Sequence, residues 1–363
     1  MAQATSDSFS ERVRVAVGRV KDPALQLDLV TAGMLKAVEV DEASGRATVE
    51  IELTSPACPS RDVISKAVED AVRTVEGVTA VEVKLSVKTR GRPNRPDNPR
   101  LPGVRNIIAV AAGKGGVGKS TVTTNLAAAL RTQGASVGIL DSDVYGPSIP
   151  QMLGDPEQPA GTEAGNKIVP AVHYGMKVIS IGFFVERGGA VIWRGPMVHK
   201  LLQQFIEDVE WGELDYLLVD LPPGTGDAQL SLSQLLPITG AVMVTTPQEV
   251  SVIDVERGIA MFNQVNTPVL GLVENMSAYI CPHCGTRDEL FGSGGAERLA
   301  RQFHIPVLGQ IPIVPAIRES GDAGTPLVVG HPDHPVSKVY VAIAEQMLDR
   351  IAAERAPAPR IVG

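Results

Sequence analysis

The chain has 363 residues and 44% hydrophobic side chains, which excludes global disorder and is enough for two domains or one large α/β domain with an appendage. Its 33 basic and 41 acidic residues give a net charge of −8, and this acidic balance argues against a dedicated nucleic-acid-binding protein. The N-terminus has no secretory signal pattern and no apolar run reaches the roughly 18 residues of a membrane span, so we expect a soluble, cytoplasmic protein.

The first part of the chain, residues 1–88, predicts a small α+β domain. Alternating apolar residues indicate strands, and an apolar residue at every third or fourth position indicates a helix. A turn-rich segment, residues 41–45, joins the first two strands. The predicted elements in chain order are a helix over residues 8–21, strands Met34–Glu39 and Ala47–Leu53, a helix from the N-cap Ser60 to Gly77, and strand Ala80–Val87.

Residues 89–104 predict a linker between two domains. Pro93, Pro96, Pro99 and Pro102 forbid a continuous helix, and no apolar period survives in this segment. We therefore expect a semi-extended tether. Its arginines leave open a second interpretation, contact with nucleic acid or with an acidic partner.

The remainder, residues 105–363, predicts an α/β domain with a doubly wound, mostly parallel sheet. Its strands are continuous Val/Ile/Leu runs separated by helical segments, as in sheets buried on both faces. Ligands of such sheets bind at the carboxyl ends of the strands. The predicted strands are Ile107–Ala112, Val137–Leu140, Lys177–Ile181, Tyr216–Asp220, Ala241–Thr245, Val269–Glu274 and Val307–Gln310.

The segment Gly113–Ser120 reads GKGGVGKS and matches the phosphate-loop motif G-x-x-x-x-G-K-[ST]. It follows a predicted strand and precedes a predicted helix, which is the context that the motif requires. Glycines let backbone N–H groups converge on phosphate oxygens, and the helix N-terminus adds partial positive charge. Lys119 is then expected to reach the β and γ phosphates, and Ser120 to bind Mg²⁺.

Two aspartates that end predicted strands complete this candidate nucleotide site. Asp220 closes an apolar strand and suits the Walker B role of holding Mg²⁺ through water. Asp143 follows another strand end and is a candidate to position the attacking water. The alternative for both is a helix cap or a turn residue.

Cys281 and Cys284 form a C-x-x-C turn, a spacing that lets two thiolates bind one face of a metal site. One chain cannot complete a four-cysteine site, because Cys58 is the only other cysteine. Two chains related by a two-fold axis can, and such a site suits zinc or a [4Fe–4S] cluster. Thiol redox chemistry and a structural role are the alternatives. Cys58 precedes a predicted helix. A helix N-terminus lowers the pKa of a thiol, so Cys58 is either a reactive thiol or an inert buried residue.

These motifs together resemble the Mrp/ApbC family of iron–sulfur cluster carrier proteins over nearly the whole chain. The phosphate loop, with its extra Lys114, resembles the deviant Walker A loop of the ParA/MinD class. The other motifs that carry the resemblance are DSDVYGPS at 141–148, WRGPM at 193–197, DLPPGTGD at 220–227, QEVS at 248–251, ENMS at 274–277 and the cysteine pair. The N-terminal domain is similar to the small domain fused to many bacterial members, with TSPACP at 54–59.

The resemblance implies a homodimeric ATPase that binds an iron–sulfur cluster between its subunits and passes it to apoproteins. From the acidic charge and from the balanced charges along the C-terminal helix, we expect no nucleic-acid and no membrane partner. It implies that Lys114 crosses the dimer interface to the partner's nucleotide, that Asn275 contacts adenine, and that iron occupies the cysteine site. Lys114, Lys119 and Asp143 are the catalytic residues on this interpretation. The expected ATP-binding residues are Gly113, Lys114, Gly115, Gly116, Val117, Gly118, Lys119, Ser120, Thr121 and Asn275.

Two rival functions share the same phosphate loop. A positioning ATPase of the MinD/ParA type that binds membranes ends in a basic amphipathic helix. Here the apolar stripe of residues 336–351 is flanked by basic and acidic side chains in balance, which favours packing on the protein body over binding to anionic lipid. The other rival is a zinc-bridged nucleotide sensor without transfer activity.

Overall fold

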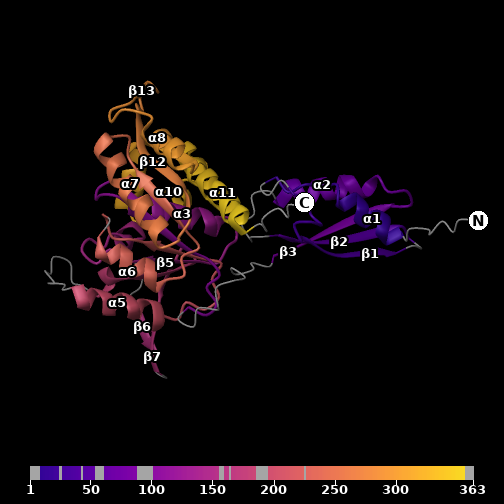
Figure 1. Cartoon of the computed structure of the whole chain (residues 1–363), viewed down its shortest axis with the longest axis horizontal. Coiled ribbons are helices and arrows are strands. Elements are labelled where there is room, and N and C mark those ends of the chain that lie inside the picture. The colour runs from indigo at the N-terminus through magenta and orange to yellow at the C-terminus, as the bar shows by residue number, and fades with distance from the viewer. Residues whose placement is uncertain are drawn as a thin grey trace, which may run out of the picture. The chain divides into compact units, whose positions relative to one another are not determined.

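The structure, a computed structural model, describes residues 9–23, 27–41, 44–53, 61–87, 101–154, 159–162, 165–184, 195–224 and 226–355. The chain divides into two compact units (Figure 1). One comprises residues 1–90 with 348–363, and the other comprises residues 91–347. Cys58, Ser60 and most of the expected linker lie outside the described residues.

The smaller unit is a three-stranded sheet packed against two helices. β1 (Leu35–Asp41) pairs antiparallel with β2 (Arg46–Leu53), which pairs in parallel with β3 (Ala80–Val87). Every second residue of β2 is buried against the helices α1 (Phe9–Val17) and α2 (Arg61–Arg73). The first helix ends at Val17, four residues before its predicted end. Gly18 follows it, and the backbone N–H groups of residues 19 and 20 close tight turns there instead.

The larger unit contains a nine-stranded sheet among its described residues, and six central strands run parallel in the order β12-β11-β4-β10-β5-β9. Every residue of β4, β5, β10 and β11 is buried, so both faces of the sheet are covered. This confirms the predicted α/β fold. The strands are β4 (Ile107–Ala112), β5 (Val137–Asp141), β8 (Ala171–His173), β9 (Met176–Ser180), β10 (Tyr216–Asp220), β11 (Gly240–Thr245), β12 (Val269–Ile280), β13 (Arg287–Asp288) and β14 (Val307–Ile313).

Helices connect these strands. α3 packs on β4, β5 and β10, and α7 packs on β4 and β11. The helices of this unit are α3 (Lys119–Thr132), α4 (Ile149–Met152), α5 (Gly195–Glu207), α6 (Asp227–Leu235), α7 (Glu249–Gln264), α8 (Gly295–Phe303), α9 (Pro315–Asp322), α10 (Leu327–Gly330), the first part of α11 (Pro335–Arg355) and a 3₁₀ turn, Ile181–Phe183. From Leu348 onward, α11 is grouped with the smaller unit. A small hairpin joins β6 (Ala160–Thr162) to β7 (Gly165–Val169). No helix in the described ranges is both long and apolar enough to span a bilayer.

One strand differs from its prediction in a way that positions a candidate site. β12 was expected to end at Glu274, but it continues to Ile280. Its second half pairs with β13, a two-residue strand after the cysteine turn, and with the end of β14. β13 was not predicted, because its two residues carry no run of alternating apolar side chains. β14 was predicted to end at Gln310, and it continues for three more residues to Ile313. The resulting β12–β13 hairpin projects from one end of the larger unit (Figure 1).

Candidate functional site

The phosphate loop lies at the carboxyl end of β4, in the middle of the parallel sheet. Gly118 is the N-cap of α3 and has a left-handed backbone, with φ 83°. A Cβ on Gly118 would lie 2.2 Å from Nδ2 of Asn275, and one on Gly113 would lie 2.4 Å from the carbonyl carbon of Asp254. Both positions therefore require glycine. The loop is held by Asn275, whose Nδ2 donates to the carbonyl of Val117 at 2.8 Å.

Three side chains converge at the start of α3 around Asp220, whose carboxylate is fully buried. Nζ of Lys119 lies 2.7 Å from Oδ2 of Asp220, and Oγ of Ser120 donates to the same oxygen at 2.6 Å. Thr123 donates to the other carboxylate oxygen at 2.7 Å. The structure thus brings together the lysine, the serine and the aspartate predicted to bind phosphate and Mg²⁺.

Asp143 faces the same cluster from the loop after β5. Its Oδ2 is 4.0 Å from Nζ of Lys119, and its Oδ1 accepts the N–H of Gly146. Burial raises the pKa of this carboxyl, and the positive charge of Lys119 opposes the increase. The geometry is compatible with the predicted role in positioning water.

Asp141, two residues earlier, was not predicted as a site residue. Its carboxylate is completely buried, accepting the hydroxyl of Ser180 at 2.7 Å and the N–H of Asp143 at 3.2 Å. Burial, together with repulsion from Asp220, raises the pKa of Asp141 to about 7. Asp141 pairs with Asp220 across neighbouring parallel strands, and the linear sequence gives no sign that these two carboxylates adjoin.

The remaining predicted nucleotide residues surround this cluster. Lys114 is half-buried at the start of the loop. The hydroxyl of Thr121 is 3.9 Å from the sulfur of Met152. The amide of Asn275 is directed at the loop backbone, so it contributes to the shape of the loop; its contact with adenine stays a prediction.

Cys281 and Cys284 form the tip of the β12–β13 hairpin, Cys281 half-buried and Cys284 exposed. The N–H of Cys281 donates to the carbonyl of Thr286 at 3.0 Å, and the N–H of Gly285 donates to the carbonyl of Cys281 at 2.9 Å. Gly285 takes the left-handed conformation that closes this turn, with φ 71°. The Thr286 side chain, its backbone N–H and the Cys281 thiol all lower the pKa of Cys284. The turn therefore presents two adjacent free thiols that can bind a metal.

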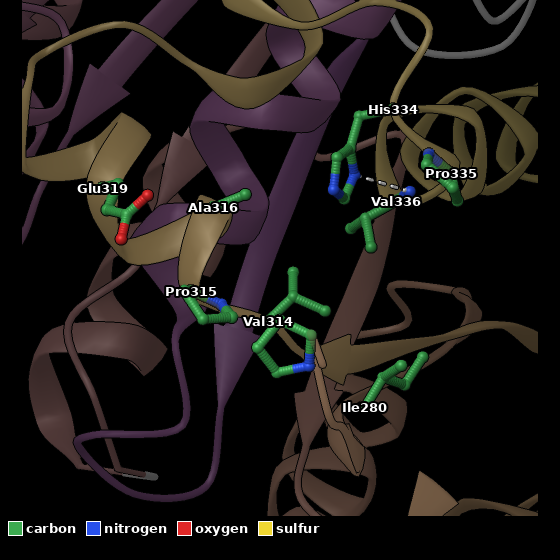
Figure 2. A pocket seen from close by; sticks show the side chains of 9 residues that line it. Ile280, Val314, Pro315, Ala316, Glu319, His334, Pro335 and Val336 are labelled. Carbon is green, nitrogen blue, oxygen red and sulfur yellow. Dashed lines mark hydrogen bonds between the residues drawn. The ribbon is translucent and has the colours of Figure 1, made fainter. Parts of the chain in front are cut away.

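An apolar pocket of about 400 Å³ adjoins this turn through Ile280 and Pro282 (Figure 2). Apart from the cysteines, the side chains of metal-ligand type at this pocket are those of His334 and Glu319. Nδ1 of His334 accepts the N–H of Val336, and Glu319 is paired with Arg318 at 3.0 Å. Among the described residues, no group of three or more His, Cys, Asp and Glu side chains is arranged to hold a metal ion. The described part of one chain therefore supplies two thiols here and no complete site.

Comparison with known proteins places both units among proteins that handle iron–sulfur clusters. The family model described as NUBPL iron-transfer P-loop NTPase matches residues 103–348, and that described as iron–sulfur cluster assembly protein matches residues 10–84. The iron–sulfur cluster carrier protein of Synechocystis sp. is 45% identical over 347 residues, which cover 94% of this chain and 98% of that protein. The carrier protein of Mycobacterium leprae is 43% identical over 93% of this chain and 92% of its own length.

Two solved structures resemble the larger unit. A nucleotide-binding protein from Archaeoglobus fulgidus in complex with ADP is 44% identical, with a TM-score of 0.55, over 61% of this chain and 87% of that one. The septum site-determining protein MinD from Pyrococcus horikoshii, complexed with Mg-ADP, is 25% identical, with a TM-score of 0.50, over 69% of this chain and 98% of that one. By fold, motifs and similarity along almost its whole length, the chain belongs to the family of iron–sulfur cluster carrier proteins, which are P-loop NTPases of the NUBPL iron-transfer type.

Proposed function

We propose that this protein is a homodimeric ATPase that carries a [4Fe–4S] cluster between two subunits and passes it to apoproteins. The observation that carries the proposal is the pair of cysteines at the hairpin tip, the half-buried Cys281 and the exposed Cys284. They supply two thiols, and a [4Fe–4S] cluster needs four ligands. Two copies of the turn supply the full set. The relatives at about 45% identity are iron–sulfur cluster carrier proteins, which favours iron over zinc.

The nucleotide side of the proposal depends on the cluster around Asp220. The side-chain oxygen atoms of Ser120 and Asp220 lie 2.6 Å apart. Because Mg²⁺ prefers oxygen ligands, these two residues would hold the ion. The bound Mg²⁺ would neutralise phosphate charge. Lys119 leaves its ion pair with Asp220 to contact the β and γ phosphates, and Asp143 orients the water that attacks the γ phosphate.

Lys114 completes the catalytic set by reaching the nucleotide of the second subunit. Its position at the start of the loop, half-buried and beside the glycines, leaves its four-carbon side chain able to extend outward. Hydrolysis on this proposal depends on dimer formation, because each site lacks one lysine until the partner supplies it.

Coupling between the two sites runs along β12. This strand carries Asn275, which bonds to the phosphate loop, and it ends at Ile280, next to Cys281. Between these two points the strand bends at Met276, whose backbone is left-handed with φ 55°, and its register against β14 shifts there. A shift of the loop on nucleotide binding is transmitted through this bent segment to the cysteine turn. We infer that ATP binding or hydrolysis changes how the two turns approach each other.

Anaerobic reconstitution with iron and sulfide tests the proposal. We expect about one [4Fe–4S] cluster per two chains, on a species of twice the monomer mass. Cys281→Ala and Cys284→Ala should each abolish the cluster and leave ATP binding unchanged, and Cys58→Ala should leave both unchanged. A complete cluster on a monomer, or one that survives loss of both cysteines, would overturn the model. Uptake of zinc alone would favour the nucleotide sensor instead.

A further inference from the structure

Thr286 makes an unusual set of contacts for a residue that lies outside the C-x-x-C motif. Its hydroxyl oxygen is 3.1 Å from Sγ of Cys284, and this contact is the largest cause of the lowered pKa of that thiol. Its carbonyl accepts the N–H of Cys281 at 3.0 Å. One residue therefore fixes the backbone of the first cysteine and approaches the sulfur of the second.

The direction of the hydroxyl contact follows from the chemistry of the sulfur. A thiol can donate or accept, but a thiolate that binds iron has no proton and can only accept. When Cys284 is a ligand, the Thr286 hydroxyl must therefore donate to it.

The hairpin determines where this hydroxyl lies. Thr286 directly precedes β13, whose Arg287 pairs with Ile280 on β12, and the bond between Cys281 and Thr286 continues that ladder into the turn. Gly285 holds the turn closed in a left-handed conformation. The contact is thus set by the backbone of the hairpin, and it is in place before any cluster arrives.

We propose that Thr286 is a positioning residue that fixes the Cys284 sulfur toward the cluster and sets how firmly that sulfur holds iron. The inference rests on the proposed function. Hydrogen bonds to a ligating sulfur withdraw electron density from it and raise the reduction potential of the cluster, and partners of this kind also orient the ligand. In a dimer the two Thr286 residues act on two of the four thiolates.

Two substitutions separate the hydroxyl from the shape of the side chain. Thr286→Val keeps the branched shape and removes the donor, whereas Thr286→Ser keeps the donor. Thr286 is exposed, so neither change disturbs a core. Thr132→Val in α3 is the matched control, since its hydroxyl donates to the carbonyl of Ala129 and not to a sulfur.

The full-length variants are reconstituted anaerobically, and two properties are measured: the reduction potential of the cluster and the rate at which an iron chelator removes it. We expect Thr286→Val to shift the potential to more negative values and to lose the cluster about tenfold faster, the lower end of the range for such partners. Thr286→Ser and Thr132→Val should match the parent protein.

Parental values for Thr286→Val in both measurements would overturn the role of Thr286 and leave the proposed function intact. Equal losses in the Val and Ser variants would also overturn it, because the hydroxyl would then not be the cause. If the parent protein takes up no cluster under the same conditions, the proposed function fails, and the inference fails with it.

Discussion

Asp220 is the residue on which the contacts of the nucleotide site converge. Its two carboxylate oxygens accept from Ser120 and Thr123 and form an ion pair with Lys119, and all of this occurs at a fully buried position. A buried carboxylate is tolerated because each oxygen has partners. The same arrangement holds Lys119 and Ser120 at the phosphate loop, so the side chains are pre-positioned in the nucleotide-free protein.

The first prediction concerns Lys119→Ala. Charge-assisted contacts are worth about 1.5–3 kcal/mol, so we expect ATP affinity to fall by roughly 10–150-fold. The nucleotide-free variant should also melt at a lower temperature, because Asp220 loses its cationic partner. Isothermal titration with ATP and thermal melting check the two effects, with Lys338→Ala as the surface control.

A double variant separates stability from binding. Lys119→Ala combined with Asp220→Asn should recover part of the lost melting temperature, since no unpaired charge remains, but none of the lost affinity. Parental ATP affinity in Lys119→Ala would contradict the assignment of the phosphate site.

The second prediction is a pH dependence that originates at Asp141. Its pKa is about 7 in the folded chain, against an ordinary value of 3.8. Between these pH values the folded state binds the extra proton, so its stability falls as pH rises through this window, by roughly a few kcal/mol in total. Asp141→Asn should therefore raise the melting temperature of the nucleotide-free protein at pH 8 and flatten its change between pH 4 and pH 7.

The exposed Asp333→Asn is the control for this measurement. In the parent protein the two carboxylate oxygens of Asp141 accept from the Ser180 hydroxyl and from the Asp143 N–H. The side-chain oxygen of asparagine can still accept one of these two hydrogen bonds. An Asp141→Asn variant that is less stable than the parent at pH 8 would show that the charged form is favoured in the fold.

At the scale of elements, the decisive unit is the turn from β4 into α3. Two glycines of this turn are required for different physical reasons. Gly116 has φ 80° and open space where a Cβ would stand, whereas Gly118 combines φ 83° with a side-chain amide 2.2 Å from the Cβ position. The first needs glycine for its conformation alone, and the second needs it for conformation and for space.

The third prediction follows from this difference. Gly116→Ala should destabilise the nucleotide-free protein by about 1–2 kcal/mol, the cost of a left-handed residue that has a Cβ. Gly118→Ala should cost more, since it also displaces Asn275 from the carbonyl of Val117. Denaturant unfolding of the two variants checks the order, and equal costs would show that Asn275 moves aside freely.

At the scale of the molecule, the two units have separate hydrophobic cores. The core of the smaller unit is built from buried residues between Val13 and Val72, and the main core of the larger unit from residues between Leu101 and Leu299. The two sets share no residue. We propose on this basis that the boundaries expected from the sequence, 1–88, 89–104 and 105–363, delimit two domains and a linker.

The fourth prediction is that a chain starting at Leu101 remains folded and binds ATP with the affinity of the full-length protein. All the nucleotide residues named above lie within it, and its core is complete. Circular dichroism and isothermal titration check the two properties, and a chain of residues 1–88 should fold separately. Aggregation of the larger piece, or loss of its ATP binding, would mean that the two parts depend on each other.

Local pattern in the sequence determined the phosphate loop, its flanking strand and helix, the parallel sheet and the roles proposed for Lys119, Ser120 and Asp220. These features depend on glycine spacing, apolar periodicity and residue types within about ten positions, so a single chain displays them. The expectation that the cysteine pair binds an iron–sulfur cluster, and not zinc, came from the family resemblance that the same motifs carry.

Only the tertiary structure revealed that Asp141 adjoins Asp220, that Asn275 holds the loop at Val117, that β12 continues to the cysteine turn, and that Thr286 approaches Cys284. Most of these contacts join residues far apart in the chain, up to the 158 positions between Val117 and Asn275. Thr286 is close in sequence, but its contact depends on how the hairpin closes. Such contacts are selected by sheet order and strand pairing, and periodicity along one segment carries no information about which other segment will lie beside it.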